Sequence, residues 1–188
     1  HQRHGRRSRA RIVTTRSEAP PPAGVAIRPA RPAEAPLVLA LIRELAEYER
    51  LAHEVTATAE EVSRALFGER PDAEALLAFH HGEPVGFALF FHNYSTFVGR
   101  RGLYLEDLFV RPAARGLGVG QALLQRLAAV ALERNCARME WAVLDWNEPA
   151  IGFYRALGAQ AMDAWTVYRL DGPNLAALAN GVAQEQNG

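Results

Sequence analysis

The stretch Arg115-Gly116-Leu117-Gly118-Val119-Gly120 decides how the rest of this chain is organised. Three glycines at every second position support neither a strand nor a helix, but they allow consecutive backbone N–H groups to point at one place. The apolar residues that follow recur at helical spacing and predict a helix beginning at this turn: Leu123, Leu124, Leu127, Val130 and Ala131. The free N–H groups and the positive dipole end of that helix face the same place, so the turn is expected to bind a phosphate group.

Other glycine-rich turns fit this stretch less well. A P-loop requires Lys and then Ser or Thr after its last glycine, whereas Gln121-Ala122 follows here. A dinucleotide-binding turn carries glycines at its first, third and sixth positions early in a βαβ unit, but these glycines occupy the first, third and fifth positions, beyond the middle of the chain. The remaining alternative is that the glycines only tighten a strand-to-helix connection. Arg115 beside them favours an anion site instead.

The run before the turn, residues 103–110, predicts a strand. Period-two alternation places one set of side chains on each face: Leu103, Leu105, Asp107 and Phe109 on the first, and Tyr104, Glu106, Leu108 and Val110 on the second. Glu106 and Asp107 are adjacent acids among apolar neighbours, and burying a carboxylate costs free energy unless something partners it. Both are therefore candidate functional residues, with ordinary acceptance of backbone N–H bonds as the alternative.

Beyond the predicted helix, residues 139–144 predict another strand. Asn147 is expected to cap a helix that has Pro149 in its first turn and ends before Gly158. Tyr154 lies on this helix, where it is either a core residue or a hydroxyl available for chemistry. Residues 165–170 predict a last strand and residues 174–179 a short terminal helix.

Earlier in the chain, residues 25–29 predict a short first strand, and an amphipathic helix follows from Glu34 to Glu49. From periodicity alone, Glu49 is a solvated acid at the helix end. Thr58-x-x-Glu61 spells a capping box and predicts a second helix that extends to Phe67. Residues 75–80 and 84–94 then predict a β-hairpin.

Composition indicates one globular domain, residues 25–188, because the 188-residue chain is 49% hydrophobic. Residues 1–24 hold six of the 21 arginines and one of the 21 acids, and we expect a flexible extension there, although its acid-poor composition also suits a transit peptide. The remainder is mildly acidic, which favours cationic ligands over nucleic acid. No apolar run approaches membrane-spanning length, the six histidines lack metal-ligand spacing, and the single Cys136 allows no internal disulfide. We therefore expect a cytoplasmic protein without a metal ion and without nucleic-acid or membrane partners.

The Arg-x-x-Gly-x-Gly pattern between a strand and an amphipathic helix resembles the pyrophosphate-binding signature of the GCN5-related N-acetyltransferases, which bind acetyl-CoA. From Ile27 onward the chain looks more closely like their diamine acetyltransferase group, the spermidine/spermine and thialysine enzymes. The segments that carry this resemblance are residues 45–49 (Leu-Ala-Glu-Tyr-Glu), 104–107 (Tyr-Leu-Glu-Asp), 115–120 and 146–149 (Trp-Asn-Glu-Pro), with Phe153-Tyr154 and Gly158-Ala159.

The resemblance implies a role for each matching residue. Tyr154 is implied as the general acid that protonates the leaving thiolate, and Glu106 as a base toward the amine. The acceptor amine would be lined by Tyr48, Glu49, Glu106 and Asp107. Acetyl-CoA would contact Leu108, Phe109, Val110, Arg115, Gly116, Leu117, Gly118, Val119, Gly120, Gln121, Asn147, Glu148, Pro149 and Ala150. For the fold, it implies an α/β domain with a mixed, strongly twisted sheet of six to seven strands, splayed between the fourth and fifth and flanked by four to five helices, and a homodimer.

The expected activity is transfer of acetyl from acetyl-CoA to a small cationic primary amine by direct attack in a ternary complex. Residues 94–97 are Tyr-Ser-Thr-Phe, whereas the polyamine enzymes of the family carry a sequence like Tyr-Asp-Pro-Trp at this place. Residues 142–147 look more like the thialysine branch. A short diamine or a lysine-like amino acid is therefore favoured over spermine. The alternatives are the same chemistry on an antibiotic amine or a peptide N-terminus, and a non-catalytic acyl-CoA-binding regulator.

Overall fold

The computed structural model describes residues 18–181 of the chain. The chain divides into two compact units, His1–Leu144 and Asp145–Gly188. Residues 1–17 of the expected extension lie outside the described residues. In the part that the structure describes, no helix is long and apolar enough to cross a membrane.

The first unit is built on a five-stranded sheet in the order β1-β2-β3-β4-β5. The strands are β1 (Val25–Pro29), β2 (Glu74–His80), β3 (Glu83–Ser95), β4 (Arg100–Val110) and β5 (Met139–Trp141). Neighbours pair antiparallel except β4 and β5, which are parallel. The predicted mixed sheet is confirmed, with five strands rather than six or seven among the described residues.

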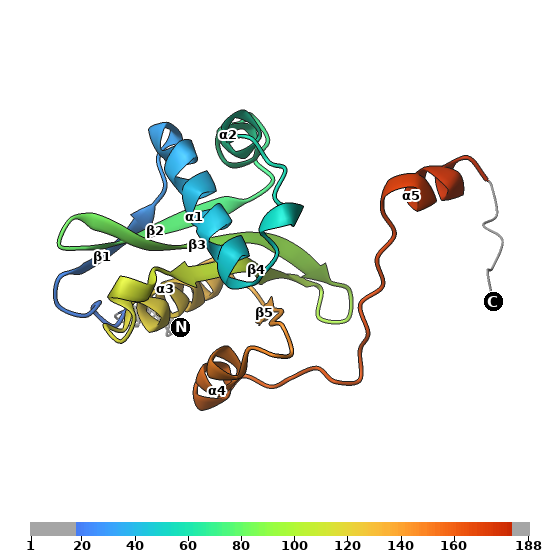
Figure 1. Cartoon of the computed structure of the whole chain (residues 1–188). Coiled ribbons are helices and arrows are strands. Elements are labelled where there is room, and N and C mark those ends of the chain that lie inside the picture. The colour runs from blue at the N-terminus through green and yellow to red at the C-terminus, as the bar shows by residue number, and fades with distance from the viewer. Residues whose placement is uncertain (1–17, 182–188) are drawn as a thin grey trace, which may run out of the picture. The chain divides into compact units, whose positions relative to one another are not determined.

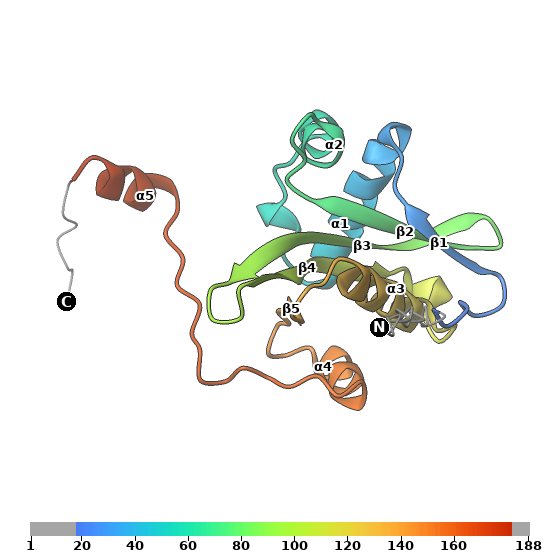
Figure 2. The ribbon, with the colours of Figure 1, turned by 180° about the vertical axis from the view of Figure 1, so that it is seen from behind.

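Helices cover both faces of this sheet. Figure 1 shows α1 (Ala35–Tyr48) and α2 (Ala59–Phe67) on one face and α3 (Val119–Glu133) on the other, and the view from behind in Figure 2 shows the same layers. Short 3₁₀ turns connect them: η1 (Pro32–Glu34), η2 (Ala52–Glu54) and η3 (Pro112–Ala114). The predicted capping box opens α2, because Thr58 Oγ1 accepts from Glu61 N at 3.2 Å and Glu61 Oε2 accepts from Thr58 N at 2.9 Å.

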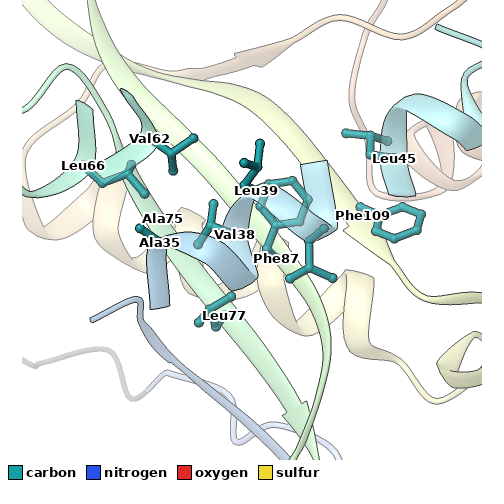
Figure 3. Close-up of a cluster of buried hydrophobic side chains, with 11 residues drawn as sticks. Ala35, Val38, Leu39, Leu45, Val62, Leu66, Ala75, Leu77, Phe87 and Phe109 are labelled. Carbon is teal, nitrogen blue, oxygen red and sulfur yellow. The ribbon is translucent and has the colours of Figure 1, made fainter. Parts of the chain in front are cut away.

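The core on the α1 and α2 face of the sheet determines which part of the sheet the last turn of α1 covers. Buried apolar side chains from both helices pack on β2, β3 and β4, as Figure 3 shows for Val38, Val62, Leu77, Phe87 and others. In that view Leu45 of α1 and Phe109 of β4 mark one end of the cluster. The last turn of α1 therefore lies over the second half of β4.

The β4–β5 ladder is short. It runs only from Leu103↔Met139 to Leu105↔Trp141, so from Glu106 onward β4 has a strand neighbour on its β3 side alone among the described residues. This early end agrees with the splay expected between the fourth and fifth strands, and it leaves one edge of residues 106–110 open.

The second unit contains α4 (Glu148–Ala156) and α5 (Gly172–Ala179). Both helices were predicted, and Asn147 caps α4 as expected, its Oδ1 accepting from Ala150 N at 3.4 Å. The strand predicted over residues 165–170 is wrong: the structure assigns it no strand. A strand requires hydrogen bonds to a neighbouring strand, and no ladder in the described residues includes this stretch.

Candidate active site

The glycine turn lies between β4 and α3, as predicted. Gly116 and Gly118 have φ values of 80° and 78°, a left-handed conformation that other residues adopt at a cost. Gly118 is also the N-cap of α3, so no side chain caps the helix and its first N–H groups have no intrahelical acceptors. An exposed helix N-terminus behind two left-handed glycines fits a diphosphate group, because its backbone donors and dipole favour negative charge.

The flanking residues of the turn divide between the surface and the core. Arg115 to Gly118 are exposed, and Leu117 is 41% exposed. Val119 is only 1% exposed, so its side chain belongs to the core and only its main chain faces the turn. Gly120 lies in the first turn of α3 close to β4, since a Cβ there would be 3.7 Å from Val110 Cγ2. Gln121 is exposed.

A β-bulge at Glu106 changes which faces the residues of β4 occupy. Leu89 pairs with Asp107 and Phe90 pairs with Leu105, so Glu106 is an extra residue without a partner on β3. The predicted strict alternation is therefore wrong. One inserted residue moves every side chain beyond it to the opposite face.

The bulge separates the side chains of β4 into two new sets. Tyr104 lies on the same face as Asp107 and Phe109, toward α1, while Leu103 and Leu105 share the α3 face with Leu108 and Val110. Phe109 is 5% exposed and packs in the core beside α1, so only its backbone can face a ligand. Leu108 and Val110 are half-buried along the open edge of β4.

Three acidic residues come together where α1 ends over β4. The pKa of Asp107 is raised to about 6, mainly by burial and then by the negative charges of Glu106 and Glu49. Burial also raises the pKa of Glu49, the residue that follows α1. Glu106 itself is exposed. The charges act on one another although Glu49 lies almost 60 positions earlier in the chain, so the fold gathers these carboxyl groups into one negative region.

Tyr48 and two arginines connect this acidic region to the glycine turn. Tyr48 is 37% exposed, and Arg115 Cζ lies 4.8 Å from its ring centroid. A second link joins Arg111, four residues before Arg115, to Glu44, four residues before Tyr48. Arg111 Nη2 donates to Glu44 Oε1 at 2.8 Å, and Arg111 Nε donates to Glu44 Oε2 at 3.0 Å. Sequence analysis missed Glu44 and Arg111, because nothing in a solvent-facing helix acid or an arginine after a strand indicates that they pair.

The second unit holds the remaining predicted residues. Asn147, Glu148, Pro149 and Ala150 form the cap and first turn of α4, where the Asn147 side chain bonds the backbone. Tyr154 lies further along the same helix, half-buried, with its ring 5.6 Å from that of Phe153. The donors of this first turn are bonded within the unit, since Ala150 N donates to Asn147 Oδ1 and Glu148 N donates to Trp146 O at 2.9 Å.

A cavity of about 370 Å³ elsewhere in the first unit does not coincide with these residues. It is lined by residues 18–21, β1 and α3, including Gln125 and Arg126. Its charged groups are already paired, since Arg126 bonds Glu18 at 2.7 Å and Arg28 bonds Glu34 at 2.7 Å. Among the described residues, no group of three or more His, Cys, Asp or Glu side chains is arranged to hold a metal ion.

Comparison with known proteins identifies the family and the fold. Residues 39–159 match the family described as Acetyltransferase (GNAT) family. The chain is 40% identical over 166 residues to a thialysine N-epsilon-acetyltransferase of Bos taurus, covering 82% of this chain and 97% of that protein. It is 32% identical over 197 residues to an L-ornithine N5-acetyltransferase of Arabidopsis thaliana, covering 81% and 86%. A solved structure of an integron cassette protein from V. cholerae aligns with a TM-score of 0.70 and 28% identity over 83% of this chain and 98% of that chain.

Proposed function

The chain belongs to the acetyltransferase (GNAT) family, and we propose that it acetylates a primary amine of a small cationic acceptor, a short diamine or a lysine-like amino acid. Relatives at 40% and 32% identity are named for thialysine and L-ornithine, both of which are amino acids that carry a side-chain amine. The enzyme is an acetyl-CoA-dependent N-acetyltransferase, and the chemical class of its acceptor amine is our inference.

The observation that carries the acceptor proposal is the acidic region of Glu49, Glu106 and Asp107. Keeping Asp107 ionised at neutral pH costs free energy, because its pKa is raised to about 6 by burial and by its acidic neighbours. A bound ammonium group lowers that cost, so this region favours a cationic acceptor. The bulge supports the proposal because it places the exposed carboxylate of Glu106 beside the half-buried carboxylate of Asp107.

Deprotonation is the first task of the acceptor site. A free alkylamine has a pKa near 10.4, so removing its proton at neutral pH costs roughly 4 kcal/mol. The Glu106 carboxylate is proposed to take this proton, directly or through water, while Tyr48, Glu49 and Asp107 bind and orient the acceptor. Tyr154 is proposed to supply the proton that the departing thiolate requires.

Acetyl-CoA, when bound, supplies an activated thioester for direct attack by the amine. The residues proposed to hold it are the turn from Arg115 to Gln121, the open β4 edge from Leu108 to Val110, and the first turn of α4 from Asn147 to Ala150. The left-handed glycines and the uncapped start of α3 support this assignment. The open edge offers main-chain donors and acceptors to an extended ligand in the manner of an added strand.

We further propose that residues 25–188 form the acetyltransferase domain behind an extension of residues 1–24, and that the protein is a cytoplasmic homodimer. Exposed aromatic side chains in the second unit, Trp165 at 78% and Tyr168 at 93%, support an association between copies. Nucleic acid and membranes are not proposed as partners. Analytical ultracentrifugation tests the oligomeric state, since a monomer at micromolar concentration would contradict this part.

The experiment that tests the proposed acceptor is a thiol-release assay with acetyl-CoA across matched amines. Thialysine, L-ornithine, L-lysine and 1,3-diaminopropane are expected to react with higher kcat/KM than spermine or an aminoglycoside. A preference for spermine, an aminoglycoside or a peptide N-terminus would contradict the acceptor class. Binding of acetyl-CoA without turnover on any amine would contradict the enzyme itself.

A further inference from the structure

Two arginines four residues apart link the segment before α3 to two α1 residues that are also four apart. Arg111 forms a bidentate pair with Glu44, and its Nη1 donates to Pro84 O at 2.8 Å. Arg115 lies over the ring of Tyr48, and its Nε donates to Val110 O at 3.3 Å. The segment that carries the glycine turn is thus connected to the acceptor end of α1 at two points.

The two connections differ in strength. The Arg111 side chain is partly buried and has three hydrogen bonds, two of them to a carboxylate, which is a strong and geometrically specific arrangement. Arg115 is exposed, and a cation over an aromatic ring at an exposed site shifts an equilibrium by only about two- to fivefold. The Arg111–Glu44 pair is therefore expected to persist, whereas a ligand that binds the Arg115 guanidinium group more strongly can displace it from Tyr48.

A diphosphate group would be that better partner. Arg115 directly precedes Gly116, where the left-handed glycines begin. Phosphate oxygens accept charge-assisted and often bidentate hydrogen bonds from a guanidinium group, which are stronger than its attraction to a ring face.

The same guanidinium group also opposes the acceptor. The acceptor amine is a cation, and the face of Tyr48 beside Glu49 already has a cation on it. Two positive groups cannot share one ring face, because they repel each other and one excludes the other sterically.

We propose that Arg115 is a shared residue that couples the two ligands: the cofactor diphosphate draws its guanidinium group off Tyr48, and this exchange completes the amine site. The inference rests on the proposed function, which supplies both ligands. Coupling of this kind is reciprocal, so the amine must tighten cofactor binding by the same factor by which the cofactor tightens amine binding.

Calorimetric titration of thialysine into the protein tests the coupling, alone and saturated with CoA, which lacks the acetyl group and so allows no turnover. In the wild type, thialysine is expected to bind at least two- to fivefold more tightly with CoA present. In Arg115→Gln, CoA is expected to bind more weakly than in the wild type, and thialysine alone is expected to bind more tightly. The coupling factor, the ratio of thialysine affinities with and without CoA, is expected to fall to about one.

Two further variants separate the coupling from general damage. Arg100→Gln removes an exposed arginine at the start of β4, one that bonds Asn135 Oδ1 at 3.1 Å, and is expected to keep the wild-type coupling. Tyr48→Leu removes the ring, so it is expected to abolish coupling while CoA binds as tightly as in the wild type or more tightly. Circular dichroism checks that each variant is folded.

Each contrary outcome has a distinct meaning. Full coupling in Arg115→Gln, or no coupling in the wild type although both ligands bind, would overturn the shared role of Arg115 and leave the proposed function intact. Failure of the wild type to bind CoA at all would overturn the proposed function and this inference with it.

Discussion

Replacing Asp107 by Asn is expected to stabilise the protein and to weaken its activity. The pKa of Asp107 rises from 3.8 to about 6 in the folded chain, mainly through burial and then through the charges of Glu106 and Glu49. Between these two pH values the folded protein holds more protons on this group than the unfolded chain does. Its contribution to stability therefore falls as the pH rises through that window, and the full cost is present above pH 6.

The size of the effect follows from the shift. About two pKa units correspond to roughly 3 kcal/mol at pH 8, and about half of that cost is already present at pH 5. Asparagine carries no charge at either pH, so Asp107→Asn is expected to raise the free energy of unfolding by these amounts. For a chain of this size the gain is roughly 6–12 °C in Tm at pH 8 and about half as much at pH 5. The KM of the amine is expected to rise, because the cation loses the negative charge of the half-buried Asp107.

Thermal unfolding followed by circular dichroism at pH 5, 6, 7 and 8 measures this dependence. Glu34→Gln provides a control of opposite sign, because a hydrogen bond from Arg28 lowers the pKa of Glu34 to about 2. That carboxylate contributes stability that is fully present above the unfolded pKa and lost only in acid, so its removal destabilises equally from pH 6 to 8. A gain in Asp107→Asn that is equal at pH 5 and 8, or a loss at pH 8, would contradict a raised pKa of Asp107 in the folded chain.

Other changes test the two ends of the site. Glu49→Gln is expected to raise the KM of the amine about tenfold with little change in acetyl-CoA affinity, and equal loss of both ligands in titrations would indicate a folding defect instead. Gly116→Ala and Gly118→Ala should each destabilise the protein by about 1–2 kcal/mol in urea unfolding and weaken CoA binding, since both glycines have positive φ. Gly118→Ala should be the worse of the two because its Cβ would lie 3.1 Å from Pro22 Cγ, whereas nothing lies within 4 Å at Gly116.

Much of the fold could be predicted from the sequence because its signals are local. The capping box of Thr58 and Glu61, the glycine turn and the Asn147 cap each depend on residues within one helical turn of each other. The predicted helices and the first five strands therefore appear with ends shifted by only a few residues.

The bulge at Glu106 could not be predicted, because it depends on pairing with a different strand. Alternation within residues 103–110 is equally good with or without an inserted residue, and only the register against Leu89 and Phe90 reveals it. The strand predicted at residues 165–170 failed for a related reason. A suitable residue composition does not supply the neighbouring strand on which a ladder depends.

The chemistry of the candidate site was only partly accessible from the sequence. From periodicity alone Glu49 is a solvated helix-end acid, and only the family resemblance implies that it lines the amine site. The structure shows that its charge acts on Asp107, and the amine role stays a proposal. The contact of Arg115 with Tyr48 joins residues far apart in the chain, and no local pattern indicates it.

The acetyl transfer and the acid role of Tyr154 are tested by the turnover of the wild type and Tyr154→Phe with acetyl-CoA and thialysine. The affinity of each protein for CoA is measured alongside. We expect rapid thiol release by the wild type and a kcat about 10²- to 10⁴-fold lower without the phenol hydroxyl, with unchanged CoA binding. Wild-type kcat in Tyr154→Phe would contradict the acid role, and a wild type that binds CoA but releases no thiol with any amine would contradict the acetyl transfer itself.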